Sequence, residues 1–339
     1  MSSSHSQLVA CLIVLAALCH AQVPNCNGGN DKISKLPGYT PNGNTQPYMN
    51  EYSGFVEVNE TANGSIFYWF IETISKTADE NTPVLIWLNG GPGASSLSGL
   101  FAENGPYRIK DDGVTLEFNN NSWIQYYHML FVDNPIGTGF SFCNNDSYVT
   151  NEDQMGAQFV NFLVGFYKCH NNFSSNPLYI TGESYAGRYI PFIAKHVLEN
   201  KNTVDIPLQG LAIGNGIYDP YIQFRSAPTY AFNLGIIDQQ QYEVISENVN
   251  DCLNLASTDP YTAADECVTI TNDIYSVYGG NIFQYNVYIL NADVFDSITA
   301  DIGNYLGQKS VAQAIHTYGI STWKSSDGTS SPNPVYEAL

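Results

Sequence analysis

The sequence places a serine at a sharp turn between a strand-like run and a helix-like run. This position is typical of a catalytic nucleophile. Ser184 stands in the stretch GESYAG, between the apolar run LYIT and the helical run RYIPFIAKHVLEN. A nucleophile elbow holds its serine in a strained backbone conformation and needs small residues two places before and two places after it. Gly182 and Ala186 meet that need. The pattern predicts an acyl-transferring nucleophile at Ser184, and the alternative is an ordinary Gly-Ser turn.

A glycine-rich turn earlier in the chain supplies a second part of such a site. The run WLNGGPGASS follows the apolar segment PVLI. Acyl transfer needs two backbone N–H groups aimed at the oxyanion that develops in the transition state. In sites of this kind one N–H comes from the residue after the nucleophile, here Tyr185, and the other from an early glycine-rich turn, here Gly91. Two such elements in the required order argue against a plain loop.

Alternating strands and helices are expected to position these two turns. The helical spacing of Met155, Phe159, Phe162 and Phe166 predicts a helix over residues 152–168. The alternation predicts an α/β fold with a mostly parallel central sheet and helices on both faces. The polar, Tyr-rich and Asn-rich segment 218–291 is expected to be an inserted helical cap, so the core would comprise residues 22–217 and 292–339. Strands are expected at residues 54–59 and 64–73, as an antiparallel pair, and at 83–88, 127–132, 178–181 and 208–214.

The amino-terminal residues and the glycosylation sequons predict the secretory route. The run LVACLIVLAALCHA has the length of a signal-peptide core, and small residues precede Gln22, so residues 1–21 are expected to be a cleaved leader. No later stretch approaches the length of a membrane span. Five sites match the N-x-S/T pattern of N-glycosylation: Asn59, Asn63, Asn120, Asn145 and Asn172.

The cysteine pattern and the net charge restrict the possible ligands and partners of the protein. After the leader the chain retains Cys26, Cys143, Cys169, Cys252 and Cys267, with no C-x-x-C pair, so no zinc or other metal site and no cofactor is expected. Cys252 and Cys267 are close together in a loop-rich stretch and are the predicted disulfide. The net charge of -20, from 12 basic and 32 acidic residues, argues against a nucleic-acid partner and suits work in acid.

Four long blocks of the sequence together resemble the serine carboxypeptidases, and most closely the vitellogenic-like, lysosomal type. The blocks are PVLIWLNGGPGASSLSGLFAENGPYRI, MLFVDNPIGTGFSF, LYITGESYAGRYIP and GLAIGNGIYDP, and the resemblance runs from about residue 36 to the end. It implies an α/β-hydrolase fold and the removal of C-terminal residues from peptides at acid pH through an acyl-enzyme. It also implies a lysosomal, vacuolar or extracellular location. The residues that would bind the terminal carboxylate of the substrate are Trp87, Asn89, Gly90, Glu103 and Glu183.

The acidic residue and the histidine that would assist Ser184 are harder to identify in the sequence. In this fold an acidic residue and then a histidine follow the nucleophile. Neither of the family's late blocks precedes Leu339, and His316 falls in the helical pattern SVAQAIH, which suits a packed helix residue. We therefore expect the final strands, the late Asp and the late His to be missing, and the chain to be an incomplete or inactive form. A non-catalytic secreted glycoprotein that binds peptide C-termini, or an acyltransferase or esterase on the same scaffold, remains an alternative. The oligomeric state is left open.

Overall fold

The computed structural model describes residues 30–144, 147–291, 293–325 and 335 of the chain. The described residues form two compact units: those up to Gly214 together with those from Ile302 onward, and residues Asn215–Asp301. The expected leader 1–21, Cys26 and the sequon at Asn145 lie outside the described residues. Within these ranges, every helix is too short or too polar to cross a membrane.

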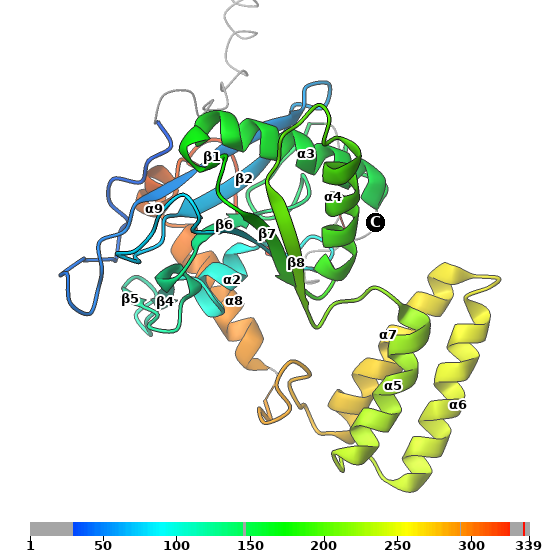
Figure 1. Cartoon of the computed structure of the whole chain (residues 1–339). Coiled ribbons are helices and arrows are strands. Elements are labelled where there is room, and N and C mark those ends of the chain that lie inside the picture. Colours follow the sequence, from blue (N-terminus) through cyan, green and yellow to red (C-terminus); the bar gives the residue numbers. More distant parts are fainter. Residues whose placement is uncertain (1–29, 145–146, 292, 326–334, 336–339) are drawn as a thin grey trace, which may run out of the picture. The chain divides into compact units, whose positions relative to one another are not determined.

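The first unit is built on a mixed sheet of six strands (Figure 1). The strand order is β1-β2-β6-β3-β7-β8. β1 and β2 pair antiparallel, as the sequence predicted, and β2 also pairs antiparallel with β6. β6, β3, β7 and β8 run parallel, which confirms the mostly parallel sheet. The strands are β1 (Glu51–Asn59), β2 (Gly64–Ile71), β3 (Val84–Leu88), β6 (His128–Val132), β7 (Leu178–Glu183) and β8 (Leu208–Gly214).

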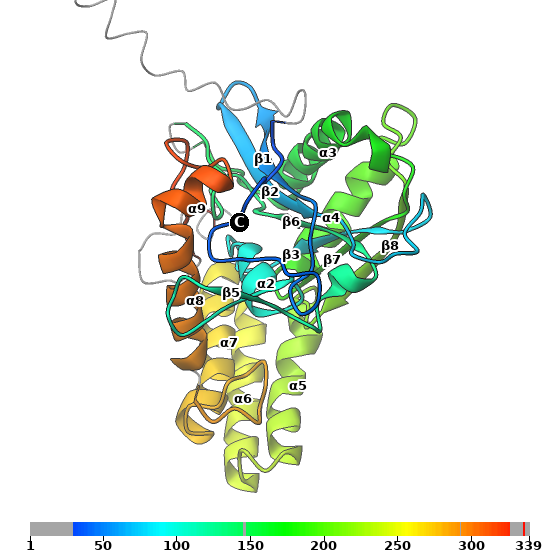
Figure 2. The same ribbon diagram turned by 90° about the vertical axis from the view of Figure 1, so that its left-hand side faces the viewer.

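Helices cover both faces of this sheet (Figure 2). One face packs against α3 and α4, and the other against α2, α9 and the last residues of α8. Side chains along β3 alternate between the two faces. Ile86 and Leu88 belong to the core on the side of α3 and α4, and Leu85 and Trp87 belong to the core on the side of α2 and α9. The helices are α2 (Leu97–Ala102), α3 (Glu152–Cys169), α4 (Ala186–Glu199), α8 (Asp293–Leu306) and α9 (Lys309–Ala314).

The helix predicted at residues 152–168 is present as α3. Its four predicted apolar positions are all buried: Met155, Phe159, Phe162 and Phe166. Asn151 caps the helix, because its side chain accepts a hydrogen bond from the Gln154 N–H at 2.9 Å. The smaller elements of the unit are β4 (Tyr107–Ile109), β5 (Leu116–Phe118), η1 (Trp123–Gln125) and η2 (Asn171–Phe173).

The second unit is helical and contains the segment 218–291 that was expected to form a cap. It has its own apolar core, which includes Ala231, Ile245 and Val249. Cys252 and Cys267 form a disulfide between two of its helices, with 5.5 Å between their Cα atoms. The elements are α5 (Pro220–Asn233), α6 (Gln239–Leu255), α7 (Pro260–Asp273) and a π-helical turn, η3 (Ile274–Tyr278).

Candidate active site

Ser184 lies in the turn between β7 and α4. Its φ is 58°, in the left-handed region that residues other than glycine rarely adopt. The Ser184 N–H donates to the Gly214 carbonyl at 3.2 Å, and the Gly187 N–H donates to the Ser184 carbonyl at 2.9 Å. A Cβ atom at Gly182 would lie 2.2 Å from the Leu88 carbonyl oxygen of β3 and 3.0 Å from Ala186 Cβ at the start of α4, so only glycine lets β7 pass this closely to both neighbours. This is the geometry that a nucleophile elbow requires.

The glycine-rich turn after β3 lies directly against the elbow. A Cβ atom at Gly90 would lie 2.3 Å from the Tyr185 amide nitrogen and 2.9 Å from Ser184 Cβ. Gly91 has a φ of 107°, a conformation that strains any other residue. The Ala94 N–H donates to the Gly90 carbonyl at 3.0 Å and closes the turn. The two backbone segments predicted to supply the oxyanion N–H groups are therefore in contact.

The Asn89 side chain joins two carboxyl groups beside the elbow. Its Nδ2 donates to Oε1 of Glu103 and to Oε1 of Glu183, each at 3.0 Å. Its Oδ1 accepts from Trp87 Nε1 at 3.0 Å and from the Gly99 N–H at 3.1 Å. Because both donors and both lone pairs of the amide are used, its orientation is fixed. Glu183 directly precedes the serine in the chain, so the structure brings together the residues that the resemblance assigned to carboxylate binding.

The two carboxyl groups hold a proton more strongly than exposed glutamates do. Burial, and next the charge of Glu183, raises the pKa of Glu103 to about 7. Burial also raises the pKa of Glu183. Two carboxyl groups that share one amide cannot both ionise at low cost, so the pair retains a proton in acid and near neutrality. A pair that holds a proton can accept a third carboxylate by hydrogen bonding, whereas a fully ionised pair repels it.

Asp133 is a buried residue of the site that was not among those predicted. Its Oδ1 accepts from Ser95 Oγ at 2.7 Å and from the Ser96 N–H at 3.0 Å, and its Oδ2 accepts from the Phe140 N–H at 2.9 Å. Burial raises the pKa of Asp133 to about 6. Trp323 Nε1 in turn donates to Ser95 Oγ at 2.9 Å. Asp133 therefore fixes the end of the glycine-rich turn, and its one signal in the sequence was an acidic residue directly after an apolar strand.

The four histidines that the structure describes are held by partners other than the serine. His316, for which the sequence indicated a packed helix position, follows the end of α9 with a φ of 64° and contacts the backbone of β1. Each ring therefore has a structural contact. The contacts are His128 Nδ1 with the Thr73 N–H (3.2 Å), His170 Nε2 with Asp31 Oδ2 (2.8 Å), His196 Nε2 with Asp153 Oδ1 (3.2 Å) and His316 Nδ1 with the Ser53 carbonyl (2.8 Å).

The predicted glycosylation sites differ in exposure. Asn63, Asn120 and Asn172 are exposed, and Asn59 is half-buried at the end of β1. Cys169, at the end of α3, is disulfide-bonded. These sites lie outside the cluster around Ser184.

Comparison with known proteins identifies the family. Residues 41–335 match the family model described as "Serine carboxypeptidase". The chain belongs to the serine carboxypeptidase family. The family is one of peptidases, and the fold of this chain is the α/β-hydrolase fold. The crystal structure of a prohormone-processing carboxypeptidase, Kex1(delta)p of Saccharomyces cerevisiae, matches with a TM-score of 0.79 and 26% identity, over 91% of this chain and 72% of that one.

Curated relatives agree with this assignment. "Probable serine carboxypeptidase CPVL" of Dictyostelium discoideum is 37% identical over 270 residues, which are 78% of this chain and 53% of the relative. "Serine carboxypeptidase S10 family member 1" of the same organism is 36% identical over 285 residues, 83% of this chain and 67% of the relative. "Pheromone-processing carboxypeptidase KEX1" of Pyricularia oryzae is 34% identical over 310 residues, 86% and 48%. The chain spans about half to two thirds of the length of these relatives.

Proposed function

We propose that this protein is a serine-type carboxypeptidase that releases C-terminal residues from peptides through an acyl-enzyme. The observation that carries the proposal is the position of the Asn89, Glu103 and Glu183 cluster next to the elbow at Ser184. An elbow alone would serve any acyl transfer. A protonated carboxyl pair held by an amide selects a substrate that ends in a carboxylate, and this favours a carboxypeptidase over an esterase or acyltransferase on the same scaffold.

The geometry suggests the following role for each residue. The terminal carboxylate of the peptide binds Asn89 and the carboxyl pair, which brings the last peptide carbonyl to Ser184. The serine oxygen attacks this carbonyl carbon, and the N–H groups of Gly91 and Tyr185 donate to the resulting oxyanion. The C–N bond then breaks, the terminal amino acid leaves with a proton on its nitrogen, and water hydrolyses the ester.

The proton acceptor for the serine is, in this proposal, a residue other than the four described histidines. Each of those histidines already has a structural partner. The same observation favours a second candidate function for the 339 residues alone, namely binding of peptide C-termini without turnover. In both cases the carboxylate site is used in the same way, so the two candidates differ only in whether a peptide bond is broken.

We place the protein on the secretory route, with its activity greatest in acid. The exposed sequons at Asn63, Asn120 and Asn172 suit glycosylation during secretion. The raised pKa of Glu103 means that the carboxylate site keeps its proton in an acidic compartment. A lysosome, a vacuole or an acidic extracellular space fits both features.

The test is release of the terminal amino acid from an amino-blocked dipeptide at acid pH, by the native protein and by its Ser184→Ala variant. We expect turnover by the wild type and loss of roughly six orders of magnitude in the variant, because triad serines contribute that much in hydrolases of this kind. Equal turnover by the two proteins would refute Ser184 as the nucleophile. Binding of the dipeptide by the wild type with no turnover would favour the second candidate.

A further inference from the structure

A fully buried tyrosine joins the two backbone segments of the predicted oxyanion hole. Tyr189 lies in α4, four residues after Tyr185, and its side chain is 0% exposed. Its hydroxyl oxygen accepts a hydrogen bond from the Gly93 N–H at 3.0 Å. Gly93 belongs to the glycine-rich turn after β3, and Tyr185 directly precedes the first residue of α4. The bond therefore connects the glycine-rich turn to the helix that follows the elbow.

The glycine-rich turn depends on contacts of this kind for a fixed shape. Gly91 and Gly93 have φ values of 107° and 86°, and glycine restrains its backbone angles less than any other residue does. A Cβ atom at Gly91 would lie 2.6 Å from the Gly93 nitrogen, so the two residues pack directly against each other. No described residue accepts a hydrogen bond from the Gly91 N–H. The bond that fixes Gly93 therefore also fixes the position of this available donor.

The helix side of this connection is held in place by a separate set of contacts. The Tyr185 hydroxyl donates to Glu152 Oε1 at 2.7 Å, and Arg188 Nη2 contacts the same oxygen at 2.7 Å. Glu152 is the first residue of α3 and is buried. The rings of Tyr185 and Tyr189 meet edge to face, with 5.2 Å between their centroids. The start of α4 is thus fixed against α3, and the Tyr189 hydroxyl sets the distance from this helix to the glycine-rich turn.

The Tyr189 hydroxyl keeps its proton both in acid and near neutrality. Burial raises the pKa of Tyr189 further above the ordinary value of a tyrosine. The hydroxyl oxygen therefore accepts the Gly93 N–H as part of a neutral group throughout this pH range. This behaviour separates its contribution from that of the Glu103 and Glu183 pair, because burial raises the pKa of Glu103 to about 7 and its charge changes there.

We propose that Tyr189 is a positioning residue for the oxyanion hole. Its hydroxyl holds Gly93, and with it the Gly91 N–H, at the distance from the Tyr185 N–H that a tetrahedral oxyanion requires. The inference rests on the proposed function, because it assumes acyl transfer at Ser184. Removal of one oxyanion donor costs about 10²–10³ in kcat, and Tyr189→Phe leaves both donors in place but loosens one, so we expect a smaller loss of about tenfold in stabilisation of the oxyanion.

The experiment compares two ligands of the Ser184→Ala protein by calorimetry. One ligand is the amino-blocked dipeptide, which probes the ground state. The other is its phosphinic analogue, in which P(O)(O⁻)–CH2 replaces the scissile C(O)–NH and presents a tetrahedral anion to the site. Tyr189→Phe should raise the dissociation constant of the phosphinic analogue by about tenfold, by the same factor at pH 5 and pH 7, and that of the dipeptide by less than about twofold.

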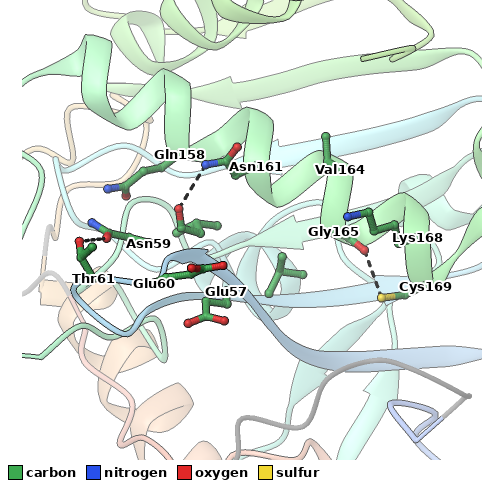
Figure 3. Close-up of a pocket in the computed structure, with 12 residues that line it drawn as sticks. Glu57, Asn59, Glu60, Thr61, Gln158, Asn161, Val164, Gly165, Lys168 and Cys169 are labelled. Atoms are coloured by element: carbon green, nitrogen blue, oxygen red, sulfur yellow. Dashed lines mark hydrogen bonds between the residues drawn. The ribbon is translucent and has the colours of Figure 1, made fainter. Parts of the chain in front are cut away.

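Tyr167→Phe is the matched control. Tyr167 is a buried tyrosine of α3 in the same apolar core as Tyr189, and no described residue bonds its hydroxyl. Figure 3 shows this part of α3, where Val164 and Lys168 line a pocket against β1. Three strands separate β1 from β7, which leads into the elbow. The control should leave the affinity for both ligands unchanged.

The outcomes separate this inference from the proposed function. Equal affinity of Tyr189→Phe and its parent for the phosphinic analogue would overturn the inference alone, and so would an equal loss for both ligands, because the hydroxyl would then support the whole site. If the parent bound neither ligand, the carboxylate site itself would be refuted, and the inference with it. Hydrogen exchange needs no ligand: the Gly93 amide should exchange about tenfold faster in Tyr189→Phe, and unchanged exchange would overturn the proposal.

Discussion

The carboxyl pair makes a quantitative prediction for peptide binding. Glu103 has a pKa of about 7 in the folded protein, so the pair keeps a proton below that pH and loses it above. If binding of a peptide carboxylate needs this proton, the affinity is constant in acid and falls once the pH passes about 7. Because binding would require one proton on the pair, the dissociation constant rises by about tenfold between pH 6 and pH 8. This is a loss of about 1.4 kcal/mol in the free energy of binding.

Variants of the glutamates test whether the carboxyl pair causes this pH dependence of peptide binding. Glu183→Gln removes the charge that, after burial, most raises the pKa of Glu103, so the pH at which affinity begins to fall should move below 7. The double variant Glu103→Gln, Glu183→Gln has no carboxyl group to titrate and should bind with nearly constant affinity from pH 6 to pH 8. The control Glu117→Gln changes an exposed glutamate on β5 and should behave as the wild type does.

Calorimetry with the Ser184→Ala protein, which cannot turn the peptide over, provides the assay. An amino-blocked dipeptide should be bound at pH 8 with uptake of about 0.9 proton, measured from the dependence of the heat on the ionisation enthalpy of the buffer. The same dipeptide with a C-terminal amide should show neither proton uptake nor the loss of affinity. The reasoning is refuted if the double variant loses affinity between pH 6 and pH 8 as the wild type does.

Three further changes test the surroundings of the site. Burial raises the pKa of Glu51 to about 7 from 4.5, so the native state holds a proton that the unfolded state releases, and the free energy of unfolding should fall by about 3 kcal/mol between pH 4.5 and pH 7. Glu51→Gln should remove that contribution in urea unfolding, and an unchanged pH dependence would contradict it. Gly90→Ala places a methyl group 2.3 Å from the Tyr185 nitrogen and should lower kcat/KM by about a hundredfold in steady-state assays; an unchanged kcat/KM would contradict the close packing of the two turns. Asp133→Asn replaces one carboxylate oxygen with an NH2 group, so a buried donor faces either the Ser96 N–H or the Phe140 N–H. The fold should be destabilised by about 1–3 kcal/mol in thermal unfolding, and no loss would show that the contact is not stabilising.

The parts of the fold that follow local rules were predictable from the sequence. The period of Met155, Phe159, Phe162 and Phe166 specified the buried face of α3. The elbow at Ser184 was predictable because small residues must flank a strained serine, and that requirement leaves a short local pattern. The family resemblance supplied the carboxylate cluster, since no local rule links Asn89 to a glutamate 94 residues later.

The contacts that were not predicted join distant parts of the chain. Trp323 and Ser95 are 228 residues apart and meet only because the segment after α9 returns to the sheet. His316 similarly contacts the backbone of Ser53, 263 residues before it. Hydrophobic period and turn composition report on neighbours in sequence, so they carry no information on such pairs.

The identity of the nucleophile can be decided by one labelling experiment. A fluorophosphonate is incubated with the native protein at acid pH, and the modified peptide is located by mass spectrometry. We expect one adduct per chain, on Ser184, lost in Ser184→Ala and suppressed by a peptide with a free C-terminal carboxylate but not by its amide. An adduct on a different serine, with Ser184 unmodified, would contradict the assignment of the elbow as the catalytic site.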